Sequence, residues 1–166
     1  MYLLCIDLSL NSTGYAVLQY EEGDLELVEK GIVNNSKIPA ARIGAKLSRI
    51  ADKIAELCSR YIFDVVVKEA SFNTGHITST QRTHQAFGVV LETLYKLGYE
   101  ELQEVAATTV KKYVGGNGKA TKDTVAKALP QFVGRQRYKT DDESDAVAVG
   151  IAYLLKNKSE INLRLQ

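Results

Sequence analysis

Three strand-like segments separated by very short turns open the chain, and they restrict its fold more than any other feature. Apolar and β-branched residues fill these segments, which we place at Tyr2–Leu8, Gly14–Tyr20 and Leu25–Val33. The separators, Asn11–Gly14 and Glu21–Asp24, consist of turn-forming residues. Separators this short join neighbouring antiparallel strands. The opening segment is therefore predicted to form an antiparallel three-stranded meander.

The rest of the chain alternates between helical and strand-like patterns. An apolar stripe with spacings of three and four residues predicts a helix with Pro39 at its entrance. The stripe consists of Ile43, Leu47, Ile50, Ile54 and Leu57. Ile62–Lys68 is β-branched and apolar on both faces, which is typical of a central strand. Ser71–Thr80 is polar and aperiodic, so we expect a loop there.

The remaining elements complete a mixed sheet. We expect a strand at Glu104–Ala107 and helices at Gln81–Leu97, Thr108–Val114, Lys122–Leu129 and Asp142–Lys156. This order predicts an α/β fold with a mixed five-stranded sheet, in which the antiparallel meander is followed by parallel strands. Helices should cover both faces of the sheet. The length of 166 residues suits one domain over residues 1–166.

Composition points to a cytoplasmic protein. Hydrophobic residues make up 45% of the chain and charged residues 25%, as in an ordinary globular protein. Cys5 and Cys58 lie in apolar contexts without metal-binding spacing, so we expect reduced thiols. The first residues lack the basic segment of a signal peptide, and no apolar run reaches transmembrane length. We therefore expect no membrane role.

Four carboxylates stand at the ends of apolar elements. Asp7 interrupts the first strand, Glu69 follows the central strand, and Asp142 and Asp145 begin the final helix. Desolvated acids are costly unless they are paired or bind metal, and clustered acids repel one another. Oxygen ligands without a His or Cys cluster favour Mg²⁺ or Mn²⁺ over zinc. Two such ions would support phosphodiester hydrolysis. A salt-bridged strand end is the alternative for Glu69.

The acids of the final helix also have a structural interpretation. Asp142 is a suitable N-cap, and Asp145 would then occupy a first-turn position where acids favour the helix dipole. For this pair alone, capping and catalysis are equally open. Asp141 and Glu143 are expected to be solvated partners of the dipole, although either could replace Asp142 as a ligand.

Basic residues are concentrated between Thr108 and Lys139, where eight of them face Asp123 as the single acid. They are Lys111, Lys112, Lys119, Lys122, Lys127, Arg135, Arg137 and Lys139. Such a segment suits a polyanion such as nucleic acid, and a solvated helix face is the alternative. Lys111 and Lys122 flank a glycine-rich turn and are candidates to contact phosphate.

Two further features suggest contacts with other molecules. Phe72, three residues after Glu69, is either a platform for stacking on a base or a buried loop anchor. The Gln81–Leu97 helix carries Val89 and Tyr95 beyond a single apolar stripe. That excess indicates either ordinary core or a dimer face.

Taken in order, these motifs resemble those of the RuvC-type Holliday junction resolvases, within the RNase H-like nuclease superfamily. The similar segments are Ile6–Val17, Glu69–Phe72, Val110–Lys122 and Asp142–Val149. They correspond to an acid followed by a turn and glycine, an acid with a nearby aromatic residue, a lysine and glycine segment, and a closing Asp-x-x-Asp-Ala helix. In place of a fully apolar run before the second acid, Lys68 stands in front of Glu69.

The resemblance implies a homodimer that binds four-way junctions, and other branched DNA as well, and resolves them by paired nicks with Mg²⁺, for which Mn²⁺ can substitute. It implies that the metal ligands and catalytic carboxylates are Asp7, Glu69, Asp142 and Asp145, with Lys122 also catalytic. It also implies that Lys111 contacts phosphate and that Phe72 stacks at the junction centre. From the basic segment we expect Lys112, Lys119, Arg135 and Arg137 to bind DNA as well. The short chain looks like a phage-encoded member, which would act in the cytoplasm of a bacterial host.

Two other functions are compatible with parts of the sequence. A branched-DNA-binding protein without catalytic activity would keep the basic segment and use its acids structurally. A phosphotransferase of the actin and sugar-kinase type also begins with an acid, a turn and glycine. That class needs two lobes to enclose a nucleotide, whereas this length provides one.

Overall fold

The computed structural model describes residues 1–71, 77–159 and 161, and it contains the predicted mixed sheet. The strands are β1 (Tyr2–Asp7), β2 (Ser12–Glu21), β3 (Asp24–Asn34), β4 (Val65–Glu69) and β5 (Gln103–Val105). Their order in the sheet is β3-β2-β1-β4-β5. The first three strands are antiparallel, while β1, β4 and β5 run parallel. The predicted meander followed by parallel strands is confirmed.

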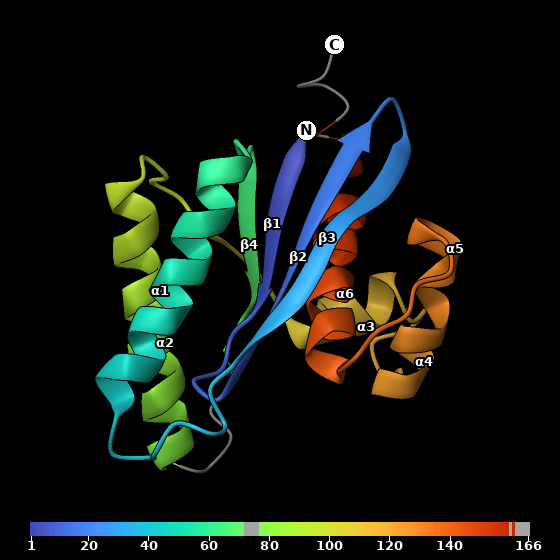
Figure 1. Cartoon of the computed structure of the whole chain (residues 1–166). Helices are drawn as coiled ribbons and strands as arrows, with labels where there is room; N and C mark the ends of the chain where they lie inside the picture. Colours follow the sequence, from blue (N-terminus) through green and yellow to red (C-terminus); the bar gives the residue numbers. More distant parts are fainter. Residues whose placement is uncertain (72–76, 160, 162–166) are drawn as a thin grey trace.

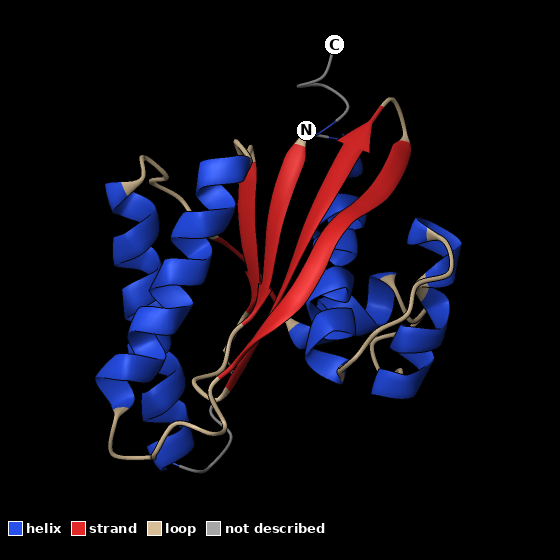
Figure 2. Ribbon diagram, in the orientation of Figure 1, coloured by secondary structure: helices blue, strands red, loops and turns tan. Residues whose placement is uncertain are grey.

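Helices cover both faces of this sheet, as the sequence predicted (Figures 1 and 2). On one face lie α1 (Ile43–Arg60) and α2 (Ile77–Lys96), which pack against each other. The other face carries α3 (Ala107–Tyr113), α4 (Lys122–Ala128), α5 (Pro130–Val133) and α6 (Asp141–Lys156). Helix α6 lies directly on β1 and β2. None of the helices within the described ranges has the length and apolar character needed to cross a bilayer.

Strand alternation divides the core into two layers. Leu4 and Ile6 of β1 belong to the layer under α1 and α2, whereas Leu3 and Cys5 belong to the layer under α6. At Gly150 of α6, an added Cβ would lie 2.3 Å from the Cys5 sulfur. The absence of a side chain there lets α6 lie close against β1. This close packing fixes the position of the helix that carries two of the four acids.

Several element boundaries differ from the sequence predictions. Pro39 does not enter the helix: its carbonyl accepts the Arg42 N–H in a turn, and α1 begins at Ile43. The strand predicted from Ile62 begins at Val65. Ile77–Thr80, expected as loop, forms the first turn of α2. The short helix α5 was not predicted, and it begins at a proline because the first helical position needs no N–H.

Candidate active site

The four predicted carboxylates come from three elements that meet at one edge of the sheet. Asp7 ends β1 and Glu69 ends β4, and these adjacent parallel strands are in register up to the pair Ile6 and Lys68. Asp7 and Glu69 therefore end neighbouring strands side by side. Each acid lies two residues along its strand from a residue that packs under α6. Because side chains alternate between faces, both acids lie on the face that α6 covers.

Gly14 allows the first turn of α6 to reach this edge. It is the partner of Asp7 in the antiparallel β1–β2 pair. A Cβ added to Gly14 would lie 2.0 Å from the backbone oxygen of Asp142, so no other residue fits without displacing the helix. Next to it, the Ser12 hydroxyl donates a short hydrogen bond to the Asp142 carboxylate. Sequence reasoning missed both roles, although a glycine opposite a strand acid was a usable signal.

The acids are close enough to alter one another's ionisation. Burial, together with the negative charges of Asp145, Glu69 and Asp142, raises the pKa of Asp7 to about 7, while Lys122 opposes the rise. The pKa of Glu69 is also raised, first by burial and then by Asp145. A bound cation would relieve this mutual repulsion and favour the ionised forms.

Lysine side chains supply positive charge around the cluster. The Lys122 ammonium donates to an Asp145 carboxylate oxygen at 2.7 Å, and this hydrogen bond raises the pKa of Lys122. The charge of Lys111, in the last turn of α3, opposes the rise in the pKa of Glu69. The glycine-rich segment therefore brings both predicted lysines to the acids.

The structure does not support the capping interpretation of the final helix. Helix α6 begins at Asp141 with Thr140 as its N-cap residue, so Asp142 is the second helical residue. Glu143, predicted to be solvated, is 3% exposed. Its carboxylate accepts the Lys139 N–H at 2.7 Å and lies 3.5 Å from the Lys30 ammonium. Asp141 is exposed as expected. Asp142 thus has no capping duty to explain its place beside the other acids.

The side chains fit a divalent cation by their chemistry. The residues that raise the pKa of Asp7 are all carboxylates, the hard oxygen ligands that suit Mg²⁺ or Mn²⁺. In the part of the chain that the structure describes, no three His, Cys, Asp or Glu side chains already form a closed metal-ligand set. The mutual repulsion of the acids and the ion pair of Lys122 with Asp145 explain why the carboxylates are apart without an ion. To bind one together, their side chains would have to move.

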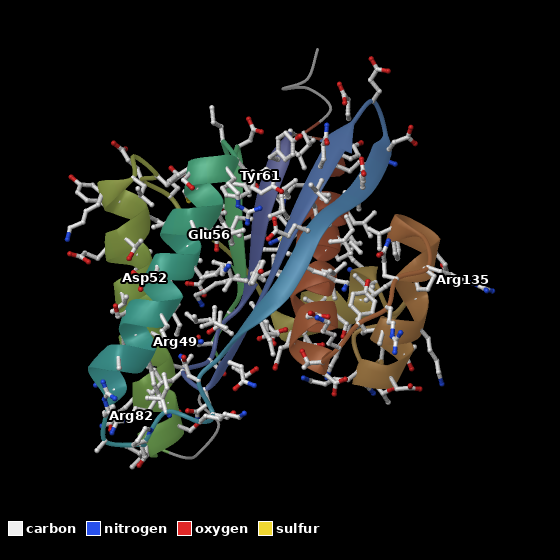
Figure 3. The ribbon with its side chains drawn as sticks, in the orientation of Figure 1. Arg49, Asp52, Glu56, Tyr61, Arg82 and Arg135 are labelled. Atoms are coloured by element: carbon white, nitrogen blue, oxygen red, sulfur yellow. The ribbon has the colours of Figure 1, made fainter. Side chains whose placement is uncertain are left out.

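The other predicted DNA-binding residues lie on the exterior. Lys112 and Lys119 are exposed on either side of the glycine-rich turn, and Arg135 and Arg137 are exposed in the segment before α6. Arg135 points outward beside α5 (Figure 3). The structure does not bring these four side chains to the acids. Phe72 lies outside the described residues, so its stacking role stays a prediction.

Comparison with known proteins agrees with this architecture. The family model described as "Crossover junction endodeoxyribonuclease RuvC" matches residues 3–153. The chain is 32% identical over 162 residues to the protein of that name from Ehrlichia ruminantium (strain Gardel), covering 96% of this chain and 99% of the relative. It is 31% identical over 153 residues to the one from Geotalea uraniireducens (strain Rf4), covering 92% and 88%.

A solved structure has the same fold. T. thermophilus RuvC in complex with Holliday junction substrate superposes with a TM-score of 0.87 at 20% identity, covering 96% of each chain. This likeness confirms the predicted RNase H-like sheet. The relatives named above are bacterial, so the phage origin expected from the short chain stays a prediction. On its matched length and its sequence identity, the chain belongs to the RuvC family of crossover junction endodeoxyribonucleases.

Proposed function

We propose that this chain is a metal-dependent DNA endonuclease that binds four-way junctions and resolves them by paired nicks. The observation that carries the proposal is the convergence of Asp7, Glu69, Asp142 and Asp145 at one sheet edge, where burial and their mutual charges raise the pKa of Asp7 to about 7. The family supports the reaction class, since its relatives are named crossover junction endodeoxyribonucleases. The solved relative bound to a Holliday junction supports the substrate.

In this proposal the four carboxylates hold two Mg²⁺ ions, and Mn²⁺ can replace them. Bound there, the ions supply Lewis acidity and an activated water for phosphodiester hydrolysis. The Ser12 hydroxyl donates to the Asp142 carboxylate and so holds it in one orientation toward the ions. The Lys122 side chain is 78% exposed, so its ammonium can leave the ion pair with Asp145 and bind a DNA phosphate instead.

The surrounding basic residues bind the DNA backbone in this proposal. Lys111 is placed next to Glu69 and contacts the phosphates nearest the cleaved bond. Lys112, Lys119, Arg135 and Arg137 are exposed and able to reach flanking phosphates of the junction arms. Phe72 is assigned to stacking at the junction centre on the family resemblance alone.

A nicking assay on matched junction, flap, fork and linear duplex DNA tests the proposal. The wild-type protein with Mg²⁺ is expected to nick the junction, and Asp145→Asn to bind the junction without nicking it. Asp123→Asn is the matched control, because Asp123 is an exposed acid that pairs with Lys127. Junction binding without cleavage in either Mg²⁺ or Mn²⁺ would instead support the branched-DNA-binding alternative.

Symmetric nicking needs two active sites, so we also propose a homodimer formed through α2. Its support is the exposed apolar surface of this helix: Leu91 is 40% exposed and Tyr95 is 70% exposed. Light scattering at micromolar concentration should give twice the chain mass for wild type and the monomer mass for Tyr95→Glu. Val28→Glu on β3 is the control for adding an acid to the surface. A monomeric wild-type protein would contradict the proposal.

We place this activity in the cytoplasm, where the junction DNA of a bacterial cell lies. The two cysteines of the chain, Cys5 and Cys58, are both free, which agrees with a reducing compartment. Retention of activity after prolonged incubation in reductant, without a change in melting temperature, is the expected behaviour.

A further inference from the structure

A buried lysine precedes the β4 acid of the site. Lys68 interrupts the apolar run before Glu69, and its side chain is 1% exposed. A lysine is seldom fully buried unless it is paired, because removing an ammonium from water is costly. A lysine in this central strand therefore needs polar contacts, and these contacts indicate its role.

The Lys68 ammonium has four partners, each from a different part of the chain. It donates to the backbone carbonyl of Glu69 at 3.0 Å, to the Glu104 carboxylate at 3.2 Å and to the Ser71 hydroxyl at 3.4 Å. It also lies 4.3 Å from the centre of the Phe87 ring on α2, a cation–π distance. One charge thus links the end of β4 to β5, to α2 and to the start of the following segment.

The sheet register explains why these contacts meet at Glu69. Lys68 and Glu104 are directly paired residues of parallel β4 and β5. One residue further along β5, the Val105 carbonyl accepts the Ala70 N–H at 2.8 Å. The carbonyl of Glu69 is therefore held by Lys68, while the amide that follows it is held by β5. Both atoms of that peptide group are fixed where β4 leaves the sheet.

Lys68 nevertheless lies on the opposite side of the sheet from the acids. Its ammonium contacts α2 on the α1–α2 face, whereas the Glu69 carboxylate lies on the α6 face with Asp7. An ammonium on the far face holds the backbone by direct hydrogen bonding, and its charge also opposes the rise in the pKa of Glu69. The direct contact between Lys68 and the acid's residue is made at the peptide group of Glu69.

We propose that Lys68 is a positioning residue that fixes the Glu69 backbone and so holds the Glu69 carboxylate in place for a divalent cation. This inference rests on the proposed function, because it assumes that Glu69 is a metal ligand. Side chains that orient metal ligands typically contribute about tenfold or more to metal affinity. Without Lys68, the Glu69 carboxylate would sample more positions. Cation binding would then have to order it, and the free energy of cation binding would be less favourable.

The test compares Lys68→Met with two control variants. Methionine keeps the apolar contact with Phe87 and removes all three hydrogen bonds, and Glu104 is 42% exposed, so its charge is not left buried. Leu94→Ala shortens a buried α2 side chain in the same core layer and serves as a destabilised control away from β4. Glu104→Gln keeps an acceptor for Lys68 and should have a smaller effect than Lys68→Met. Mn²⁺ binding is measured by electron paramagnetic resonance, and junction nicking by titration with Mg²⁺.

The expected result is a roughly tenfold weaker Mn²⁺ affinity for Lys68→Met and a matching rise in the Mg²⁺ concentration for half-maximal nicking. Metal-free junction affinity should be unchanged, and Leu94→Ala should bind Mn²⁺ like wild type. Wild-type Mn²⁺ affinity in Lys68→Met would overturn the inference. An equal loss in Leu94→Ala would also overturn it, because general destabilisation would then explain the effect. A wild-type protein that binds Mn²⁺ but nicks no junction would refute the proposed function, and the Mn²⁺ data would still decide the role of Lys68.

Discussion

Replacing Asp7 by asparagine should stabilise the metal-free protein while abolishing nicking. In the folded chain, burial and the charges of Asp145, Glu69 and Asp142 raise the pKa of Asp7 from the ordinary value of 3.8 to about 7. The ionised form is therefore disfavoured by folding. At about 1.4 kcal/mol for each tenfold change in acidity, the penalty on ionised Asp7 is roughly 4 kcal/mol. The asparagine side chain of the Asp7→Asn variant is uncharged, so it does not incur that penalty.

The sign of the pH dependence follows from proton binding. Between about pH 4 and pH 7 the folded protein keeps a proton on Asp7 that the unfolded chain has released, so the free energy of unfolding falls as pH rises. The penalty is absent below that window and complete above it. Asp7→Asn should exceed wild type by up to about 4 kcal/mol at pH 8.5, and by less than about 2 kcal/mol at pH 5.

Denaturant unfolding in EDTA at the two pH values measures this difference directly. Asp123→Asn, on the exposed surface of α4, should show no comparable gain at either pH. Mg²⁺ should raise the free energy of unfolding of wild type more than that of Asp7→Asn, because the ion binds the folded site. A variant that is less stable than wild type at pH 8.5, or a gain that is equal at both pH values, would refute the reasoning.

Three further substitutions test other contacts of the site. Gly14→Ala places a Cβ 2.0 Å from the Asp142 oxygen, so it should cost about 1–3 kcal/mol in unfolding free energy and lower nicking more than tenfold. Lys122→Met removes the exposed ion pair with Asp145; nicking should fall while the unfolding free energy changes by less than about 1 kcal/mol. Glu143→Gln weakens a buried acceptor and should cost about 1–3 kcal/mol, measured by the same denaturation. Wild-type behaviour in any of the three would contradict the contact concerned.

Local periodicity was enough to predict the parts of the site that depend on single elements. The alternation of β1 and β4 places Asp7 and Glu69 on the α6 face, as expected from a period of two. The short turns likewise predicted that the first three strands are antiparallel neighbours. These features need no knowledge of distant residues, which is why the sheet and the side-by-side position of Asp7 and Glu69 could be predicted.

The missed features depend on contacts between distant segments or on one-residue boundaries. Helix α6 begins one residue before the predicted start, and this shift removes the N-cap role from Asp142. Glu143 is buried because Lys30 of β3 and the Lys139 amide meet it, which no spacing within the helix reveals. Lys68 is stabilised by Phe87 and Glu104, which come from two other elements.

The wide spacing of the four acids along the chain has a consequence for synthesis. Asp7 and Glu69 are translated early, whereas Asp142 and Asp145 arrive with α6, after most of the sheet has been made. A nascent chain that has not reached α6 therefore holds two of the four carboxylates. If the four acids form the proposed metal site, a chain that stops before α6 should be unable to nick DNA, which keeps incomplete products from cutting the genome of their own cell.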